Sequence, residues 1–177
     1  MMYISPARAD GFMKIGLVYY SRTGNTRQVA KTLEEKFKEK NAEVDLIEIE
    51  HVKRPGYFTG GKASTFQQEL PIKNNHFDMQ KYDIIIVGSP TWSKRPSPFV
   101  KSFINKAENI MGKKIAVFST GMSRINEREQ FKEIIKNDLK NAGMKTFDSY
   151  LALQFKKEQI IDGEQNIDNF VNTVLKL

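Results

Sequence analysis

The 177-residue chain contains no cysteine. That absence excludes disulfide bonds, thiolate nucleophiles, cysteine-ligated iron–sulfur clusters and thiolate zinc sites. Histidine is also scarce, since His51 and His76 are the only two and neither has a second ligand at metal-binding spacing. We therefore predict no metal site, and the lack of disulfide chemistry favours a reducing, cytoplasmic location.

Long apolar runs are missing as well. No segment approaches the ~20 apolar residues that cross a bilayer, and residues 1–13 lack the charged start and apolar core of a secretory signal. We expect no membrane span. Residues 1–13 precede the first strand pattern and are predicted to be a flexible leader, and residues 14–177 are predicted to form a single domain.

Acidic residues are the minority among the charged ones. The chain has 28 Lys and Arg against 21 Asp and Glu, a formal net charge of +7. Such a charge attracts acidic partners over a distance. The lysines are spread over helix faces and form no arginine-rich or aromatic–basic block, so nucleic-acid binding is not expected.

Strand and helix patterns alternate along the chain, which indicates an α/β fold. The third and fourth strands are continuously apolar, whereas the second and fifth carry polar residues and are expected at the edges of the sheet. We predict a three-layer, doubly wound, five-stranded parallel sheet of order 2-1-3-4-5, with a ligand crevice at the carboxyl ends of strands one and three. The strands are predicted at 14–20, 43–49, 83–88, 113–119 and 145–155, and the helices at 25–40, 97–108, 125–142 and 165–176.

Three polar loops are expected to meet at that crevice. The first opens a helix, and its hydroxyls and free N–H groups at the positive end of the helix dipole suit a phosphate. The second holds the only tryptophan, which suits stacking on a flat ring, and the third adds backbone donors. A phosphate and a planar ring together describe a mononucleotide such as flavin mononucleotide (FMN). The predicted cofactor-binding residues are Ser21, Arg22, Thr23, Gly24, Asn25 and Thr26; Ser89, Pro90, Thr91, Trp92, Ser93 and Lys94; and Ser119, Thr120, Gly121 and Met122.

The sequence resembles the flavodoxin family over nearly its whole length, from about Lys14 to Leu177. Tyr19 to Thr26 is similar to the phosphate-loop signature of that family, Gly88 to Trp92 to its first flavin-flanking loop, and Phe118 to Gly121 to its second. The resemblance implies a flavodoxin-like fold of the short-chain type that binds FMN without a covalent bond. It implies no catalytic residue, because the cofactor carries the chemistry.

Two features depart from the family pattern. Family electron carriers are typically acidic, whereas this chain is basic, so we expect a redox partner protein with an acidic surface and a flavin potential raised by Lys94 and Arg95. Residues 89–98 contain no glycine, so a backbone flip through positive φ costs roughly 1 kcal/mol or more here. This favours two-electron chemistry.

The function predicted from these patterns is an FMN-binding redox protein that transfers electrons to a protein partner. One alternative is an FMN-dependent oxidoreductase that takes electrons from NAD(P)H and reduces a quinone. A second alternative is a non-redox module that binds a mononucleotide or a partner. Residues 50–81 are ambiguous: a short helix is possible at 62–70, and Tyr57 and Phe58 either pack under their own loop or cover the flavin.

Overall fold

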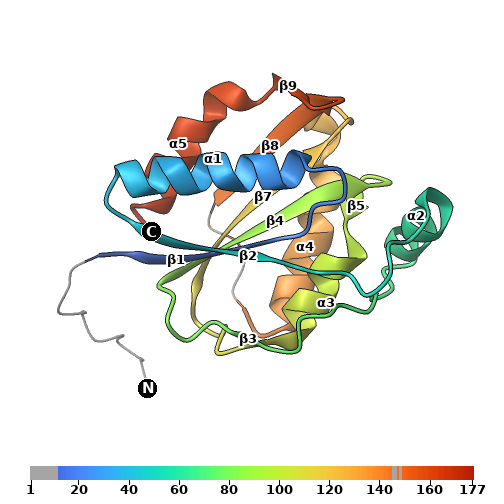
Figure 1. Cartoon of the computed structure of the whole chain (residues 1–177), viewed down its shortest axis with the longest axis horizontal. Coiled ribbons are helices and arrows are strands. Elements are labelled where there is room, and N and C mark those ends of the chain that lie inside the picture. The colour runs from blue at the N-terminus through green and yellow to red at the C-terminus, as the bar shows by residue number, and fades with distance from the viewer. Residues whose placement is uncertain (1–11, 145–146, 148) are drawn as a thin grey trace.

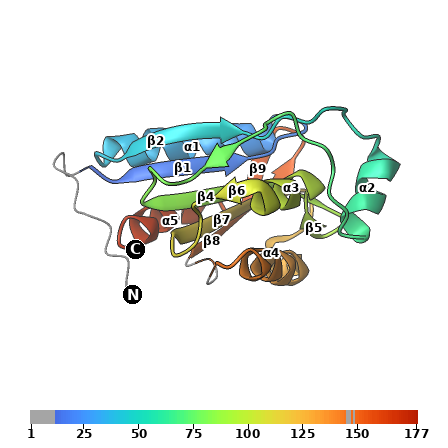
Figure 2. The ribbon, with the colours of Figure 1, turned by 90° about the horizontal axis from the view of Figure 1, so that it is seen from below.

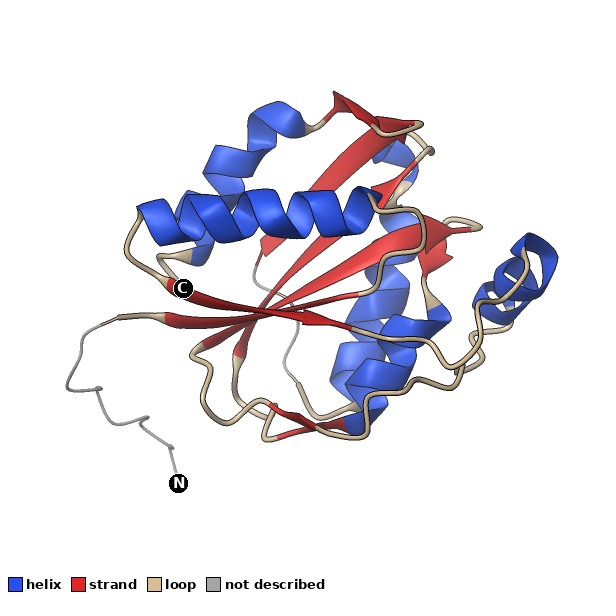
Figure 3. Ribbon diagram, viewed as in Figure 1, coloured by secondary structure: helices blue, strands red, loops and turns tan. Residues whose placement is uncertain are grey.

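A computed structural model describes residues 12–144, 147 and 149–177. Its centre is a sheet of five parallel strands, extended by one antiparallel strand (Figures 1 and 3). The order is β2 (Glu43–Glu48), β1 (Lys14–Tyr19), β4 (Ile84–Trp92), β7 (Lys114–Gly121), β8 (Ser149–Lys156) and the antiparallel β9 (Gln159–Asp162). The flavodoxin-like order 2-1-3-4-5 is confirmed by the five parallel strands.

Helices cover both faces of the sheet. On one face α1 (Asn25–Glu39) and α5 (Ile167–Val174) bury apolar side chains against Ile15 and Ile86, and on the other α3 (Pro98–Lys106) and α4 (Glu129–Asn141) pack over Val18 and Val87. Successive strand residues point to opposite faces, so one continuously apolar strand supplies both layers. The two helix layers hold the carboxyl ends of β1, β4 and β7 at one edge of the molecule.

Local sequence signals explain where α3 begins and where α4 ends. The side chain of Ser97 accepts a hydrogen bond from the N–H of Phe99 at 3.4 Å, and Pro98 occupies the first turn of α3. Gly143 has a φ of 80°, a left-handed conformation that glycine adopts at little cost, directly after α4.

The ambiguous stretch 50–81 contains a helix that lies earlier than expected. Helix α2 (Tyr57–Thr65) projects from one end of the molecule (Figures 1 and 2), so the prediction of a helix at 62–70 was wrong for its second half. Gly60 in this helix packs so closely on Trp92 that an added Cβ would lie 3.0 Å from the indole ring. Tertiary packing on Trp92 therefore offsets the low helix propensity of the glycines.

Two short strand pairs and two 3₁₀ turns complete the described chain. β3 (Phe77–Asp78) pairs with β6 (Ala107–Glu108), and β5 (Arg95–Pro96) pairs with the end of β4. The 3₁₀ turns η1 (Ile125–Glu127) and η2 (Glu164–Asn166) precede α4 and α5. The second predicted loop, 89–94, is thus mostly strand, because Ser89 to Trp92 continue β4 and turn back through β5.

The fifth predicted strand is not a free edge over its whole length. β9 pairs with β8 from Gln154 to Lys156, and within the described residues no strand pairs with the first half of β8 on that side. Residues 145, 146 and 148, predicted to begin this strand, lie outside the described residues, as do residues 1–11 of the predicted leader. Met13 is described, and its carbonyl accepts a hydrogen bond from the N–H of Glu43 at 2.9 Å.

Over the described ranges, none of the helices has the length and apolar run that a bilayer crossing requires.

Candidate functional site

A cavity of about 660 Å³ opens where β1, β4 and β7 end, at the crevice expected from the strand order. That volume lies within the range of cofactor sites in proteins. Its walls come from the three predicted loops, from α2 and from the turn between β8 and β9. The lining residues are Arg22, Thr23, Asn25, Thr26, Tyr57, Gly61, Pro90, Thr91, Trp92, Ser93, Thr120, Gly121, Met122, Lys157 and Glu158.

The first loop bends around the hydroxyl of Ser21. Its Oγ accepts hydrogen bonds from the N–H groups of Gly24 and Arg27, both at 3.2 Å. Gly24 takes a φ of 102°, a left-handed conformation suited to glycine, and Asn25 begins α1. The N-terminus of α1 therefore points its positive dipole end at the cavity, which suits an anion such as a phosphate.

One hydroxyl pair joins the first loop to the third. Thr26 Oγ1 and Thr120 Oγ1 lie 2.9 Å apart, and both side chains are buried although their residues line the cavity. The contact fixes the start of α1 against the end of β7. This hydrogen bond holds the first and third loops at a defined separation, as the binding of a rigid ligand between them requires.

Arg22 connects the first loop to α2. Its guanidinium carbon lies 4.1 Å from the centre of the Tyr57 ring and 5.3 Å from that of the Trp92 ring, and Nη2 donates to the carbonyl of Pro55 at 3.0 Å. Cation–π contacts of this kind contribute about 0.5–2 kcal/mol. The stack holds α2 beside the cavity, where Tyr57 and Gly61 form part of the wall.

The second loop is a hairpin with an unusual turn. Ser93 and Lys94, which link β4 to β5, have φ values of 49° and 63°, left-handed for both. Ser89 supports this hairpin from beneath, since its Oγ accepts from the N–H of Ser97 and donates to the carbonyl of Pro90, each at 2.9 Å. Trp92 reaches the cavity wall above this support, in edge contact with Tyr20 at 5.8 Å.

The third loop rests on a buried arginine. The side chain of Arg128 is 0% exposed, and its Nη1 donates to Ser119 Oγ at 2.7 Å. Its Nη2 lies within bonding distance of the carbonyls of Gly121, Ser123 and Leu153, at 3.3, 3.0 and 3.2 Å. Burial lowers the pKa of Arg128 from its ordinary value, which is the direction expected when a charged group leaves water.

The turn after β8 adds a wall that sequence reasoning missed. The carbonyl of Lys157 accepts from Asn25 Nδ2 at 2.8 Å, and Gln154 Nε2 donates to the carbonyl of Met122 at 3.0 Å. Lys157 and Glu158 thereby reach the cavity. The signal was two apolar runs separated by Lys157-Glu158, but neither residue favours a tight hairpin turn.

The structure brings most of the predicted site residues together. Eleven line the cavity, namely Arg22, Thr23, Asn25, Thr26, Pro90, Thr91, Trp92, Ser93, Thr120, Gly121 and Met122. Five do not line it, namely Ser21, Gly24, Ser89, Lys94 and Ser119. Among these, Ser21, Ser89 and Ser119 are buried supports of the loops, and Lys94 is an exposed residue of the hairpin turn. Their assignment to a cofactor stays a prediction.

Buried polar atoms without a partner test whether the cavity fits a polar, flat ligand. In the described part of the chain, the buried side-chain atoms without a hydrogen bond are Tyr20 Oη, Arg22 Nε and Thr91 Oγ1. Arg22 and Thr91 both line the cavity. An unpaired buried polar group is costly, and a ligand that hydrogen-bonds to it removes that cost. Together with the helix terminus and Trp92, these unpaired atoms fit a phosphorylated heteroaromatic molecule.

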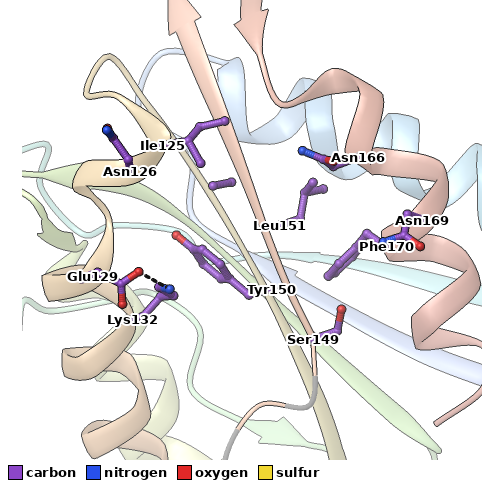
Figure 4. Close-up of a pocket in the computed structure, with 11 residues that line it drawn as sticks. Ile125, Asn126, Glu129, Lys132, Ser149, Tyr150, Leu151, Asn166, Asn169 and Phe170 are labelled. Carbon is purple, nitrogen blue, oxygen red and sulfur yellow. Dashed lines mark ion pairs between the residues drawn. The ribbon is translucent and has the colours of Figure 1, made fainter.

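A second cavity, of about 390 Å³, lies beside the first half of β8 and contains none of the predicted site residues. Figure 4 shows Tyr150 extending across it from β8, near the ion pair of Glu129 with Lys132. The Tyr150 hydroxyl lies 2.6 Å from Ser119 Oγ. This cavity therefore touches the support of the third loop from behind. No group of three or more potential metal ligands occurs in the ranges described.

Comparison with known proteins identifies a family whose model matches most of this chain. A family model described as NADPH-dependent FMN reductase matches residues 13–158. No curated protein matches the chain.

Solved structures of similar fold include flavoproteins and flavodoxins. A flavoprotein in complex with FMN from Lactobacillus acidophilus has 18% identity and a TM-score of 0.67, over 89% of this chain and 98% of that one. Oxidised Flavodoxin 2 from Bacillus cereus has 22% identity and a TM-score of 0.61, over 92% and 98%. Two-electron reduced Megasphaera elsdenii flavodoxin has 17% identity and a TM-score of 0.60, over 92% and 99%. At these identities the likeness concerns the fold.

Proposed function

Because the chain belongs to the NADPH-dependent FMN reductase family, whose members are flavodoxin-like FMN-binding proteins, we propose that it is an FMN-dependent oxidoreductase that takes electrons from NAD(P)H. The proposal develops the alternative that the sequence left open beside the electron carrier. It does not require a catalytic acid or base in the polypeptide.

The residues at the cavity divide between the two ends of the cofactor. Thr23, Asn25 and Thr26 at the start of α1 hold the phosphate through hydroxyls and backbone N–H groups. Trp92 flanks the flavin ring, and the unpaired hydroxyl of Thr91 becomes a hydrogen-bond donor to it. Bound FMN supplies two-electron chemistry, accepting reducing equivalents from a nicotinamide and passing them to an acceptor.

The wall that α2 adds to the cavity is the observation that favours a reductase over a carrier. A carrier needs only an exposed flavin edge, whereas a reductase needs a pocket beside the ring in which a second flat molecule binds. Tyr57 and Gly61 supply such a wall, and the Arg22 guanidinium holds Tyr57 in place at 4.1 Å. Arg22 and Lys157 line this cavity against a single acidic residue, Glu158, so its wall carries a positive charge that would attract a phosphate-bearing dinucleotide.

NAD(P)H oxidation by the FMN-loaded protein tests the proposal. We expect steady turnover with a quinone as acceptor. Replacing Tyr57 by alanine should raise the KM for the nicotinamide by about fivefold while the Kd for FMN stays the same, since a loss of about 1 kcal/mol in one binding step has that effect.

The neighbouring Phe58 provides a matched control. Its side chain is 93% exposed and is absent from the cavity wall, so Phe58→Ala removes an aromatic ring from the same helix without changing the pocket. Kinetics of Phe58→Ala should match those of the wild type. A yellow, FMN-loaded protein that oxidises neither NADH nor NADPH would refute the reductase.

An electron carrier is the second candidate, and with a net charge of +7 its partner protein would have to be acidic. Exposed Lys94 lies in the hairpin turn next to the cavity wall and is suited to contact an acidic redox partner. A carrier would reduce an acidic partner protein at a rate that falls steeply with salt, and would not turn over NAD(P)H. A colourless protein that does not bind added FMN would instead support the non-redox binding module.

A further inference from the structure

Arg128 is a buried cation without a buried anion. Among the described residues no ion pair joins it to a carboxylate; its partners are the hydroxyls of Ser119 and Ser123, three backbone carbonyls and the phenol of Tyr150. Burying an unpaired charge is expensive even when its hydrogen bonds are satisfied. A neutral side chain could fill the space at lower cost, so the retained charge requires an explanation beyond packing.

The charge lies directly behind the cavity wall. Arg128 Nη2 contacts the carbonyl of Gly121, and a Cβ built on Gly121 would lie 3.5 Å from Nη2 and 3.0 Å from the Thr91 Cβ. Gly121 and Thr91 both line the cavity, so a wall one residue thick separates the guanidinium from the ligand space. Gly121 and Thr91 belong to the third and second loops, which are the loops predicted to hold the flavin ring.

We propose that Arg128 supplies a permanent positive charge behind the third loop that makes the protein hold reduced, anionic FMN more tightly than oxidised FMN. The inference rests on FMN binding at this cavity. Two-electron reduction adds two electrons to the flavin, and a nearby cation favours the form that takes up one proton and keeps a negative charge. In a site shielded from water, such an interaction is stronger and less screened than at the surface.

The surrounding contacts keep the charge in place. Ser119 Oγ accepts from Nη1 at 2.7 Å and lies 2.6 Å from the Tyr150 hydroxyl, while Ser123 Oγ accepts from Nε at 3.0 Å. The guanidinium is therefore held on several of its donors, and the third loop is held by the guanidinium. Arg128 thus acts on the flavin through its charge, and also positions the loop that contacts it.

Midpoint potentials measured by anaerobic titration separate these two roles. For Arg128→Met we expect the preference for reduced over oxidised FMN to fall by at least about tenfold, a drop of about 30 mV in the two-electron potential. Arg128→Lys loses the forked hydrogen bonds but keeps a charge, so it should recover at least half of that drop. Equal drops in both variants would show that the effect comes from loop geometry and would overturn the proposal, as would an unchanged potential in an Arg128→Met protein that binds FMN.

Lys94 provides the matched surface control. Its ammonium is exposed and lies 3.9 Å from Glu127 Oε2, so any effect of Lys94→Ala should vanish when salt rises from roughly 50 to roughly 500 mM. The effect of Arg128 should persist, because the buried charge is shielded from ions. An Arg128 effect that disappears at the higher salt would contradict a buried origin.

The wild-type protein keeps the proposal testable even where Arg128→Met does not fold. Its bound FMN should have a higher two-electron potential than free FMN at both salt concentrations, and a lower potential than free FMN would overturn the inference. The Kd of oxidised FMN, measured first by fluorescence quenching, distinguishes a failure of the proposed function from a failure of the proposed role of Arg128. Absence of binding refutes the proposed function itself, whereas binding without a raised potential refutes only the role of Arg128.

Discussion

Replacing Thr91 by valine should stabilise the FMN-free protein and weaken its binding of FMN. Thr91 Oγ1 is buried without a hydrogen-bond partner. An unsatisfied buried polar group costs about 1–3 kcal/mol, and valine has nearly the same shape without the hydroxyl. We expect the free energy of unfolding to rise by about 1 kcal/mol, which for a chain of this size raises the Tm by roughly 2–4 °C.

The same hydroxyl is proposed to donate to the flavin, so its loss should raise the Kd for FMN by about fivefold, the equivalent of about 1 kcal/mol. Thermal unfolding without FMN and fluorescence titration with FMN measure the two effects separately. The essential result is that the substitution stabilises the FMN-free protein while it weakens the binding of FMN. A Thr91→Val protein that is less stable without FMN would show that the hydroxyl already has a partner and would refute the reasoning.

Thr120→Val is the matched control for this experiment. Thr120 is buried, whereas Thr91 is partly exposed with only its Oγ1 shielded, and the Thr120 hydroxyl lies 2.9 Å from Thr26 Oγ1. The same substitution therefore removes a made hydrogen bond and leaves the Thr26 hydroxyl unpaired, with an expected loss of about 1–2 kcal/mol. Two identical replacements in adjacent strands should thus change stability in opposite directions.

Three further substitutions test features of the fold, each by urea unfolding. Gly163→Ala should destabilise by more than about 2 kcal/mol, since Gly163 has a φ of 92° and its Cβ would lie 2.2 Å from the Ala152 carbonyl oxygen. Lys94→Gly should stabilise by about 0.5–1 kcal/mol, because glycine relieves the left-handed φ of 63°; no gain would mean that the turn is unstrained. Burial raises the pKa of Asp138 despite Lys101 at 3.8 Å, so the native state binds this proton more tightly and stability falls as pH rises through the raised pKa. Asp138→Asn should therefore match the wild type near about pH 3 and exceed it near about pH 7, and a variant less stable at the higher pH would contradict that sign.

The parallel core was predictable because its sequence signals are strong and local. Apolar runs such as Ile84 to Val87 require burial on both faces, and the pair Ser97-Pro98 marks a helix start without reference to the rest of the fold. Loops that follow neighbouring parallel strands must meet at one edge. That rule alone was sufficient to predict that most of the proposed site residues line one cavity.

The hairpins were not predictable on the same basis. The turn from β4 to β5 is Ser93-Lys94, and the turn from β8 to β9 is Lys157-Glu158. Short hairpins are usually recognised in a sequence by glycine or asparagine at these positions, and neither turn has one. Ser93, Lys94 and Lys157 adopt positive φ because the paired strands impose it. The wall formed by Lys157 and Glu158 therefore depends on tertiary structure.

Arg128 shows the same limit for the site. It stands among charged residues at the start of α4, a pattern typical of solvent exposure, yet its side chain is fully buried. Only the meeting of α4 with the ends of β7 and β8 surrounds it with carbonyl and hydroxyl oxygens. Such an environment is assembled from distant segments and leaves no local signature.

The pairing of β9 with only part of β8 affects how readily a strand of another molecule could pair with this edge of the sheet. An intruding strand that paired along the margin from Ser149 to Leu153 would meet the β9 ribbon after that short stretch, and the ammonium of Lys132 stands over the Tyr150 ring beside it. Obstruction and charge are the devices by which natural sheets avoid joining into fibrous assemblies. Both features hinder the pairing of another strand with the side of the sheet that faces away from β2.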